Sequence, residues 1–317
     1  MLEKGTDYSL TYDPGRKKPG TYHVTISLTG RYKGSKKLTF TICQNTGKTK
    51  KAGKWIYETK KDKNGNQKKV KKAYRFNNGR YPVGATKIGK TWYYFKGQKG
   101  KLDRSKKDCH LAESGSRQFA VASDGRLKSG WQVIDKKLYC FDGKYHSAIC
   151  GETKDKIRLT ESGEAAPSME ATVKISAITL LETITDRDAS KSTQLKAVYS
   201  YMITRSHFQY STAKYPDLSN AKWTHSTACD MMTTHSGNCY SFAAMFAAMA
   251  HEIGYQDVKV YCGRVHGSRD GAGDGFTRHA VTVIDGRYYD TEAHFAGWDR
   301  GIYGLSAYPL TFKQVKK

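Results

Sequence analysis

Alternating hydrophobic and polar positions at the start of the chain predict three short β-strands. The alternation runs over residues 8–12, 22–28 and 38–42, and turn sequences rich in Gly and Pro separate the three runs. Three short strands bury too little apolar surface to fold as an independent domain. We therefore expect residues 1–43 to be one part of a larger β module.

A sequence repeat dominates residues 44–150, which are rich in Lys, Gly and Tyr. Residues 79–97 align without gaps on residues 125–143, at an offset of 46 residues, and eight of the 19 aligned positions are identical. Each copy has the pattern of a short strand, a turn and an aromatic strand. A hairpin of this size cannot bury its own aromatic face, so the repeat predicts stacked β-hairpins.

Helical periodicity starts only in the second half of the chain. Residues 151–168 have mixed charges and a Pro, which predicts a linker. Residues 178–184 predict one helix, and residues 191–207 predict a second helix that Asp188 or Ser190 can cap. The apolar residues that recur at helical spacing in the second helix are Leu195, Val198, Tyr199 and Met202.

Charge is concentrated in the first half of the 317 residues. The chain has 54 Lys+Arg and 29 Asp+Glu, a formal net charge of +25. Up to Ser168 there are 38 basic and 15 acidic residues, whereas from Met169 onward there are 16 and 14. A basic half is expected to bind a polyanion such as nucleic acid, an anionic membrane or an anionic cell wall. No apolar run of about 18 residues is present, so we expect no membrane span.

The cysteines and histidines do not have the spacing of a metal site. No two cysteines form a C-x-x-C pair, which argues against a zinc ribbon. The odd number of cysteines leaves at least one thiol unpaired within a monomer. We expect Cys229 and Cys262 to be core or disulfide-paired thiols, and we expect no metal and no cofactor. The other cysteines are Cys43, Cys109, Cys140, Cys150 and Cys239, and the histidines without metal-ligand spacing are His225, His235, His251, His266 and His294.

Cys239 stands where an Ala-rich sequence predicts the start of a helix. Ser236 or Asn238 can cap this helix, and Gly254 is a natural stop. The exposed N–H groups and the macrodipole at a helix start favour a thiolate, which is the nucleophilic form of cysteine. Cys239 is therefore the candidate nucleophile.

A nucleophilic cysteine needs a base, and the base needs an orienting partner. His279 lies in the alternating run 278–284, and Asp285-Gly286 predicts a two-residue hairpin turn. If residues 287–292 form the return strand, Ile284 faces Arg287. The two residue numbers of every cross-strand pair then add up to 571. His279 then faces Glu292 and has Asp290 as its diagonal neighbour, with all three side chains on one face. Either carboxylate could orient the imidazole, and Asp290 is our first choice.

These residues closely resemble the transglutaminase-like superfamily, which has papain-like folds with a Cys-His-Asp triad. The resemblance covers roughly residues 169–308 and includes Gly237-Asn-Cys239, His279-Ala-Val281 and Tyr289-Asp290, at spacings of 40 and 11 residues. It implies an α+β catalytic domain over residues 169–317. In that domain Cys239 is the nucleophile, His279 the general base and acid, and Asp290 the orienter.

Two further features surround this candidate site. An oxyanion needs hydrogen-bond donors where its charge develops, and the backbone N–H of Cys239 is one candidate. The resemblance implies a second donor from an upstream side chain, for which Trp223, Gln209 and Tyr210 are the alternatives. The Gly-rich residues 263–275, which include Arg269 and Asp270, predict a mobile loop that could select substrate or simply be solvated.

The first half of the chain carries two more resemblances. Gly5-Thr-Asp-Tyr8, Gly20-Thr-Tyr and Gly30-Arg-Tyr-Lys-Gly34 resemble the C-terminal half of bacterial Ig-like surface modules. Gly130-Trp131 and Tyr93-Tyr94-Phe95 resemble the cell-wall-binding repeats, choline- or glucan-binding, of Gram-positive surface proteins. In that family, aromatic side chains of neighbouring hairpins form cages for choline or sugar. The resemblance thus implies wall-ligand roles for Trp92, Tyr94 and Trp131, whereas the alternative is that they only build the core.

Together these patterns predict a multidomain, wall-associated enzyme with an all-β N-terminal part and an α+β C-terminal domain. Its expected activity is cysteine-dependent acyl transfer on a protein or peptide through a thioester, by peptidase or transglutaminase chemistry, with hydrolysis favoured. The start of the chain has no apolar signal-peptide core, so the protein is either cytoplasmic or a mature fragment of a secreted protein. The rival function is a surface adhesion protein whose C-terminal domain is only a scaffold. A nucleic-acid binder is disfavoured because no nucleic-acid fold motif is present.

Overall fold

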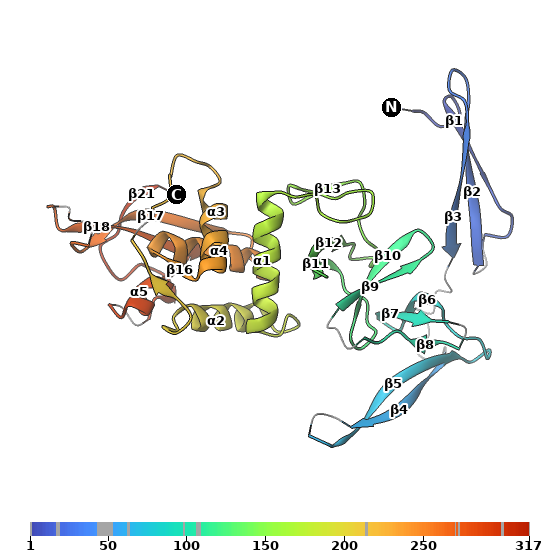
Figure 1. The fold of residues 1–317 in the computed structure, drawn as a ribbon, viewed down its shortest axis with the longest axis horizontal. Coiled ribbons are helices and arrows are strands. Elements are labelled where there is room, and N and C mark those ends of the chain that lie inside the picture. Colours follow the sequence, from blue (N-terminus) through green and yellow to red (C-terminus); the bar gives the residue numbers. More distant parts are fainter. Residues whose placement is uncertain are drawn as a thin grey trace. The chain divides into compact units, whose positions relative to one another are not determined.

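The computed structural model describes residues 2–16, 20–42, 53–61, 64–97, 99–105, 109–212, 215–269, 271, 273–298 and 301–316. Cys43 and Asp270, which the sequence analysis named, lie outside these residues. The chain divides into two units, which are Met1–Lys154 with Arg158–Glu164, and Asp155–Ile157 with Ala165–Lys317. In the described residues the first unit is built of β-strands, and the second contains helices α1 to α5 together with a sheet (Figure 1). This confirms the predicted all-β and α+β classes.

The three predicted N-terminal strands are present. They are β1 (Tyr8–Tyr12), β2 (Gly20–Leu28) and β3 (Ser35–Ile42), and they form an antiparallel sheet in the order β1-β2-β3. Strands β2 and β3 each begin two or three residues earlier than the sequence alternation indicates. The Ig-like character of this module stays a prediction.

The 46-residue repeat is a repeat of hairpin structure. In the first copy, β6 (Gly84–Ile88) pairs with β7 (Thr91–Lys96), and Gly84 lies opposite Phe95. In the second copy, β11 (Gly130–Ile134) pairs with β12 (Lys137–Phe141) in the same register. The predicted hairpins are therefore confirmed. The other strands of this region are β4 (Gly53–Lys61), β5 (Gln67–Phe76), β8 (Lys101–Leu102), β9 (Cys109–Ser114) and β10 (Arg117–Ala122).

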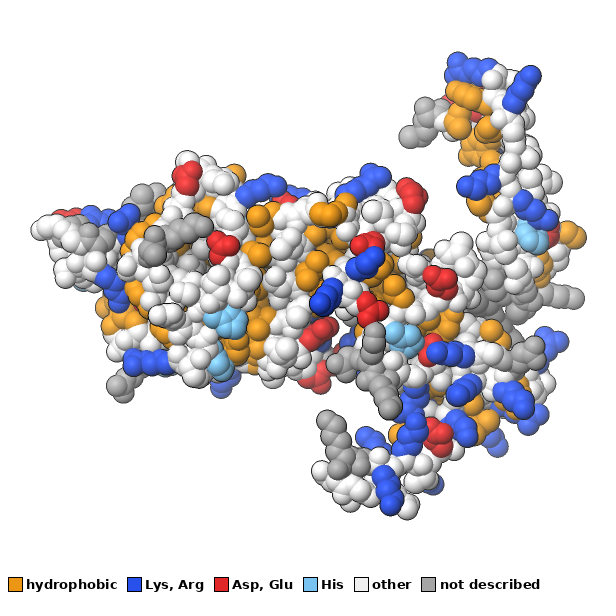
Figure 2. Space-filling model, viewed as in Figure 1, with side chains coloured by type: hydrophobic (Ala, Val, Ile, Leu, Met, Phe, Trp, Pro, Cys, Tyr) orange, Lys and Arg blue, Asp and Glu red, His pale blue; other side chains and the backbone are white. Residues whose placement is uncertain are grey.

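Each hairpin of the repeat region adds aromatic residues to a small buried cluster. Phe95 and Phe141, at equivalent positions of the two copies, are each almost fully buried, in separate clusters. Basic side chains occupy the outer surface, and Figure 2 shows Lys and Arg gathered over the β4 to β8 region. The exposed lysines of the β4–β5 hairpin are Lys54, Lys60, Lys61, Lys68, Lys69 and Lys72.

The predicted linker over residues 151–168 contains a further short hairpin. Strands β13 (Thr153–Lys154) and β14 (Ile157–Arg158) flank a turn in which Asp155 and Lys156 have left-handed φ angles of 49° and 64°. Ile157 and Leu159 are fully buried. The mixed charges of this segment led to the linker prediction, but two buried aliphatic side chains are enough to order a tight hairpin.

The helices of the second unit surround one central helix. They are α1 (Met169–Ile184), α2 (Lys191–Met202), α3 (Trp223–Thr234), α4 (Cys239–Ile253) and α5 (Thr291–Ala296). Helix α1 begins earlier than predicted because the Ser168 hydroxyl accepts a hydrogen bond from the Ala171 N–H at 3.1 Å. Helix α2 ends at Met202 rather than at His207, whose Nδ1 donates back to the Tyr201 carbonyl at 3.0 Å.

An antiparallel sheet packs against α4. Its order is β20-β19-β18-β17-β21, and the strands are β17 (Val258–His266), β18 (Phe276–Ile284), β19 (Arg287–Tyr289), β20 (Tyr303–Leu305) and β21 (Lys313–Lys316). Close packing of α4 on β18 is visible in the hydrogen bond from Thr282 Oγ1 to the Ala243 carbonyl, at 2.9 Å. None of the helices in the described residues is both long and apolar enough to cross a membrane.

Candidate active site

The start of α4 sets the position of Cys239. Asn238 is extended, its side chain accepts a hydrogen bond from the Tyr240 N–H at 3.1 Å, and its own N–H donates to Ser241 Oγ. This capping box makes Cys239 the first residue of the helix, as predicted. A Cβ at Gly237 would collide with the Ser241 side chain, so the residue before the cap must be small. Cys239 itself is 2% exposed.

His279 reaches the site from the central strand of the sheet. Strands β18 and β19 pair with Ile284 opposite Arg287, which is the predicted register. Asp285 and Gly286 have left-handed φ angles of 49° and 75°, as a two-residue hairpin turn of this kind requires. The imidazole of His279 is 2% exposed, and it faces the start of α4.

The predicted return strand over residues 287–292 is too long. Strand β19 ends at Tyr289, and the chain turns at once into α5 with Asp290 as its N-cap. Asp290 Oδ1 accepts the Ala293 N–H at 2.9 Å, so the cap competes successfully with continued strand pairing. Glu292 therefore lies in the first turn of α5 and not across the sheet from His279.

Asp290 is the carboxylate that bonds directly to His279. Its Oδ2 lies 2.6 Å from His279 Nε2. The Tyr308 hydroxyl donates to the same Oδ2 at 2.6 Å, and the cap bond holds Oδ1. Three donors thus fix one buried carboxylate. The sequence analysis assigned no role to Tyr308, because a single Tyr 18 residues beyond Asp290 carries no local signal.

The thiol lies on the other side of the imidazole. Cys239 Sγ is 3.8 Å from the carbonyl oxygen of Arg278, the residue before His279. Cys239 also contributes to the raised pKa of His279. Because Asp290 engages Nε2, the nitrogen available to the thiol is Nδ1. The three predicted residues therefore come together in the order thiol, imidazole, carboxylate.

The electrostatics of the pair favour an imidazolium beside a carboxylate. Burial alone would lower the pKa of His279, but Asp290 and the Cys239 thiol raise that pKa well above its ordinary value. Burial alone would raise the pKa of Asp290, but His279 and the hydrogen bonds from Ala293 and Tyr308 lower it. The charged forms of His279 and Asp290 are therefore stable over a wider pH range than those of the free side chains.

Glu292 is a second carboxylate beside the imidazole, and it approaches the thiol-facing nitrogen. Its Oε2 lies 3.8 Å from His279 Nδ1, and its Oε1 accepts from Arg269 Nη1 at 3.0 Å. Burial raises the pKa of Glu292. Glu292 is therefore not the orienter that the strand register allowed. The Arg269 guanidinium also lies over the Tyr210 ring, 4.7 Å from its centroid.

The three alternatives for a second oxyanion donor have different surroundings. Tyr210 lies in β15 (Gln209–Tyr210), which pairs in parallel with β16 (Ser236–Gly237), and this brings it close to Cys239. Burial is the main cause that raises the pKa of Tyr210 to about 12. Gln209 is exposed, and the Trp223 ring packs against Tyr240 with ring centroids 5.9 Å apart.

The predicted wall-ligand residues are partly core residues. Tyr94 is 7% exposed, its ring packs against Phe119, and its hydroxyl donates to the Glu113 carbonyl. Trp92 is half-buried against the same cluster, and Trp131 is half-buried in β11. Tyr94 therefore has a packing role, while ligand binding by the three residues stays a prediction. Cys229 and Cys262 contribute to the core of the second unit, as expected.

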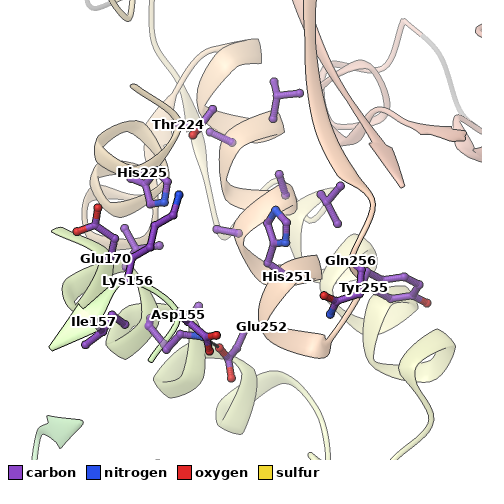
Figure 3. A pocket seen from close by; sticks show the side chains of 18 residues that line it. Asp155, Lys156, Ile157, Glu170, Thr224, His225, His251, Glu252, Tyr255 and Gln256 are labelled. Atoms are coloured by element: carbon purple, nitrogen blue, oxygen red, sulfur yellow. Dashed lines mark hydrogen bonds and ion pairs between the residues drawn. The ribbon is translucent and has the colours of Figure 1, made fainter. Parts of the chain in front are cut away.

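A cavity of about 570 Å³ lies elsewhere in the second unit and contains none of the predicted site residues. His251 and Glu252 line it from the C-terminal end of α4 (Figure 3). Cys239 is the first residue of that helix, at its opposite end. His225 lines it from α3, and burial lowers the pKa of His251. Glu252 is held by Lys174 and Arg187, each at 2.9 Å.

One set of side chains in the described residues has the geometry to hold a cation. His279, Asp290 and Glu292 each offer one ligand atom, and these atoms lie within 4.8 Å of one another. The imidazole–carboxylate bond and the ion pair with Arg269 engage the same groups. The arrangement of a buried thiol, imidazole and carboxylate at a helix start is suited to nucleophilic catalysis.

Comparison with known families agrees with this geometry. Residues 178–291 match the family model described as the Transglutaminase-like superfamily. This segment is similar to the transglutaminase-like family over those residues. Cys239, His279 and Asp290 all fall within the matched residues. No curated protein matches the chain.

Several solved structures are similar to part of the chain. The choline-binding domain of Spr1274 from Streptococcus pneumoniae is 16% identical, with coverage of 27% of this chain and 95% of that one and a TM-score of 0.23. A candidate cysteine protease from Cytophaga hutchinsonii is 15% identical, with coverage of 40% of each chain and a TM-score of 0.28. The multimodular pneumococcal cell wall endolysin from phage Cp-1, complexed with choline, is 26% identical, with coverage of 42% and 36% and a TM-score of 0.25. This chain spans less than half of the last two.

Proposed function

We propose that the transglutaminase-like domain is a cysteine-dependent acyl-transfer enzyme in which Cys239 is the nucleophile. His279 is the general base and acid, and Asp290 orients it. The observation that carries this proposal is the buried arrangement in which the imidazole bonds to Asp290 through Nε2. Cys239 lies beside it at the helix start, with Sγ 3.8 Å from the Arg278 carbonyl oxygen.

The chemistry follows from these positions. The Cys239 thiolate attacks a carboxamide or peptide carbonyl carbon, and the carbonyl oxygen takes up the negative charge near the Cys239 N–H. His279 Nδ1 gives its proton to the departing amine as the C–N bond breaks, which leaves a thioester. A water or an amine then loses a proton to Nδ1 and attacks the thioester, and the thiolate leaves.

Hydrolysis and transamidation differ only in the acceptor that reaches the thioester. We favour peptide hydrolysis as the first activity to assay and transamidation as the second. The full chain is incubated with a peptide library, with and without a primary amine. New peptide termini indicate proteolysis, whereas loss of about 17 Da together with attachment of the amine indicates transamidation. Absence of both products would support the rival function, in which the domain is a scaffold in a surface adhesion protein.

We further propose that the first unit holds the enzyme on an anionic or choline- or glucan-containing polymer at the cell surface. Support comes from the repeated aromatic hairpins and from the charge, since residues up to Ser168 carry 38 basic and 15 acidic side chains. Polyanion binding by such a surface weakens as salt rises, because counterions screen it. A sedimentation assay with purified cell walls at low and high salt tests this attachment.

Replacing Tyr308 by Phe is expected to slow alkylation of Cys239 by iodoacetamide about tenfold, because the Asp290 carboxylate loses a charge-assisted hydrogen bond. Loss of that bond also raises the pKa of Asp290, so the acidic limb of the rate profile moves to higher pH. The measurement is the rate of thiol alkylation by iodoacetamide as a function of pH. Tyr288→Phe is the control, since the Tyr288 ring packs 5.9 Å from Tyr308 without a bond to Asp290. Equal profiles for both variants would contradict the prediction.

A further inference from the structure

Glu292 is buried beside His279, and one of its two carboxylate oxygens lacks a hydrogen bond. Its side chain is 1% exposed, and Oε1 bonds to Arg269. Oε2 has no hydrogen-bond partner and lies 3.8 Å from His279 Nδ1. A buried carboxylate is costly unless charged partners and hydrogen bonds compensate it. The ion pair with His279 leaves Oε2 without a hydrogen bond, so a ligand that donates one would fit at this position.

The side chain of Arg269 indicates that the position beside Glu292 and Tyr210 favours a cationic group. Its guanidinium makes an ion pair with the carboxylate at 3.0 Å and lies 4.7 Å from the centroid of the Tyr210 ring. A carboxylate on one side and an aromatic face on the other form a site for a cation. Arg269 comes from the loop between β17 and β18, and its side chain is 41% exposed, so it can leave without disturbing the core.

The position of this site relative to His279 assigns it to the amine side of the reaction. In the proposed function, Nδ1 protonates the leaving amine and deprotonates the entering nucleophile. Both groups must therefore lie within hydrogen-bond distance of Nδ1, next to Glu292 Oε2. The leaving and entering amines use the same position, because the two half-reactions are the reverse of each other.

We propose that Glu292 and Tyr210 form a cation subsite for the amine side of the substrate, and that Arg269 occupies this subsite in the resting enzyme. The subsite accepts an amine that carries a second, positively charged group a few atoms away, such as a diamine or the amino group of a basic residue. The reacting N–H donates to Glu292 Oε2, while the charged group displaces Arg269 from Oε1 and the Tyr210 ring. This inference rests on the proposed function of Cys239 and His279.

The test uses p-nitrophenyl acetate as a generic acyl donor, because no natural substrate is required. Cys239 displaces p-nitrophenolate and forms an acetyl thioester, which then partitions between water and an added amine. Ethylenediamine supplies a second, cationic group, whereas ethanolamine has a hydroxyl at the equivalent place. Mass spectrometry of the full-length enzyme's products gives the ratio of acetylated amine to acetate. The product ratio of each variant is divided by the parent's ratio for the same amine, so the intrinsic reactivity of each amine cancels.

Opposite changes are expected in two variants. Glu292→Gln should lower the partition ratio for ethylenediamine about tenfold, because a charge-assisted contact is lost. Arg269→Ala should raise that ratio several-fold, because the competing guanidinium is gone. With ethanolamine, Arg269→Ala should stay within about twofold of the parent, since no charged group needs the subsite. Glu292→Gln should lower the ethanolamine ratio less than the ethylenediamine ratio, because only the contact with the reacting N–H is changed.

Arg264→Ala is the matched control. Arg264 lies in the same hairpin, but it pairs with Asp274 at 2.8 Å rather than with Glu292. If Arg264→Ala raised the ratio as much as Arg269→Ala, loop mobility would explain the effect and the subsite would be refuted. An unchanged ratio in Arg269→Ala would also refute it, even if the buried Glu292→Gln variant did not fold. Failure of the parent to release p-nitrophenolate in a Cys239-dependent way would instead refute the proposed function.

Discussion

Cys239→Ala is expected to lower catalytic turnover at least about 10⁴-fold, because removal of the nucleophile prevents formation of the thioester. The thiol is the only atom of the site that can form the covalent bond, and the imidazole–carboxylate pair beside it has no substitute. The substitution removes one buried sulfur at the first position of α4 and leaves the Asn238 cap in place. The measurement is product formation from a responsive peptide, together with the intact mass of the protein after incubation with iodoacetamide.

Cys229→Ala is the control for this prediction. Cys229 lies in α3 and is half-buried against the same core. We assign it no part in the proposed chemistry of His279. We expect near-parental turnover and an unchanged rate of labelling at Cys239. If Cys239→Ala retained turnover, or if Cys239 reacted no faster than an ordinary exposed thiol, the catalytic proposal would be wrong and the scaffold function would stand.

Asp290→Asn is expected to reduce kcat/KM by about 10²- to 10⁴-fold, because the amide keeps the size of the side chain but removes the charge that orients and stabilises the imidazolium. Without that charge, the pKa of His279 falls. The imidazolium that protonates the leaving amine is then lost at lower pH, so the alkaline limb of the profile moves to lower pH. The measurement is kcat/KM as a function of pH for parent and variant. An unchanged alkaline limb would contradict the role of Asp290.

The same pair predicts how folding stability depends on pH. The raised pKa of His279 stabilises the folded state fully below the ordinary histidine pKa, and this contribution is lost as pH rises through the raised value. The lowered pKa of Asp290 stabilises the folded state above the ordinary aspartate pKa, and this contribution is lost as pH falls. Asp290→Asn should therefore flatten the decline of Tm above about pH 6.5. Asp274→Asn is the control, since that exposed carboxylate pairs with Arg264 and should leave the slope unchanged.

Local patterns were sufficient to predict the elements that carry the thiol and the imidazole. The Asn238 cap and the Gly254 stop define α4 because both act within one turn of the helix. The Asp285-Gly286 turn defines the β18–β19 register because the two left-handed positions lie next to each other in sequence. The 46-residue repeat predicted the equivalent hairpins for the same reason, since each hairpin forms from adjacent residues.

Strand geometry inferred from the sequence left Glu292 as a rival to Asp290, which was the first choice. Asp290 and Glu292 are two residues apart, and a continued strand would place both on the face of His279. The chain instead enters α5 after Tyr289, because capping of that helix by Asp290 outweighs further strand pairing. Because of this turn, Asp290 contacts Nε2 of His279 and Glu292 lies nearer Nδ1. The two carboxylates therefore have different contacts with the same imidazole.

The sequence by itself therefore determined the elements that carry Cys239 and His279 and the class of each unit, since these depend on short-range caps, turns and periodicity. Only the tertiary structure decided which carboxylate bonds to His279, that Tyr308 donates to it and that Arg269 pairs with Glu292. These contacts join side chains 11 to 23 residues apart through the packing of α5, a loop and the C-terminal segment around one buried imidazole. Their energies come from burial and charge compensation in three dimensions, which no local pattern of residues encodes.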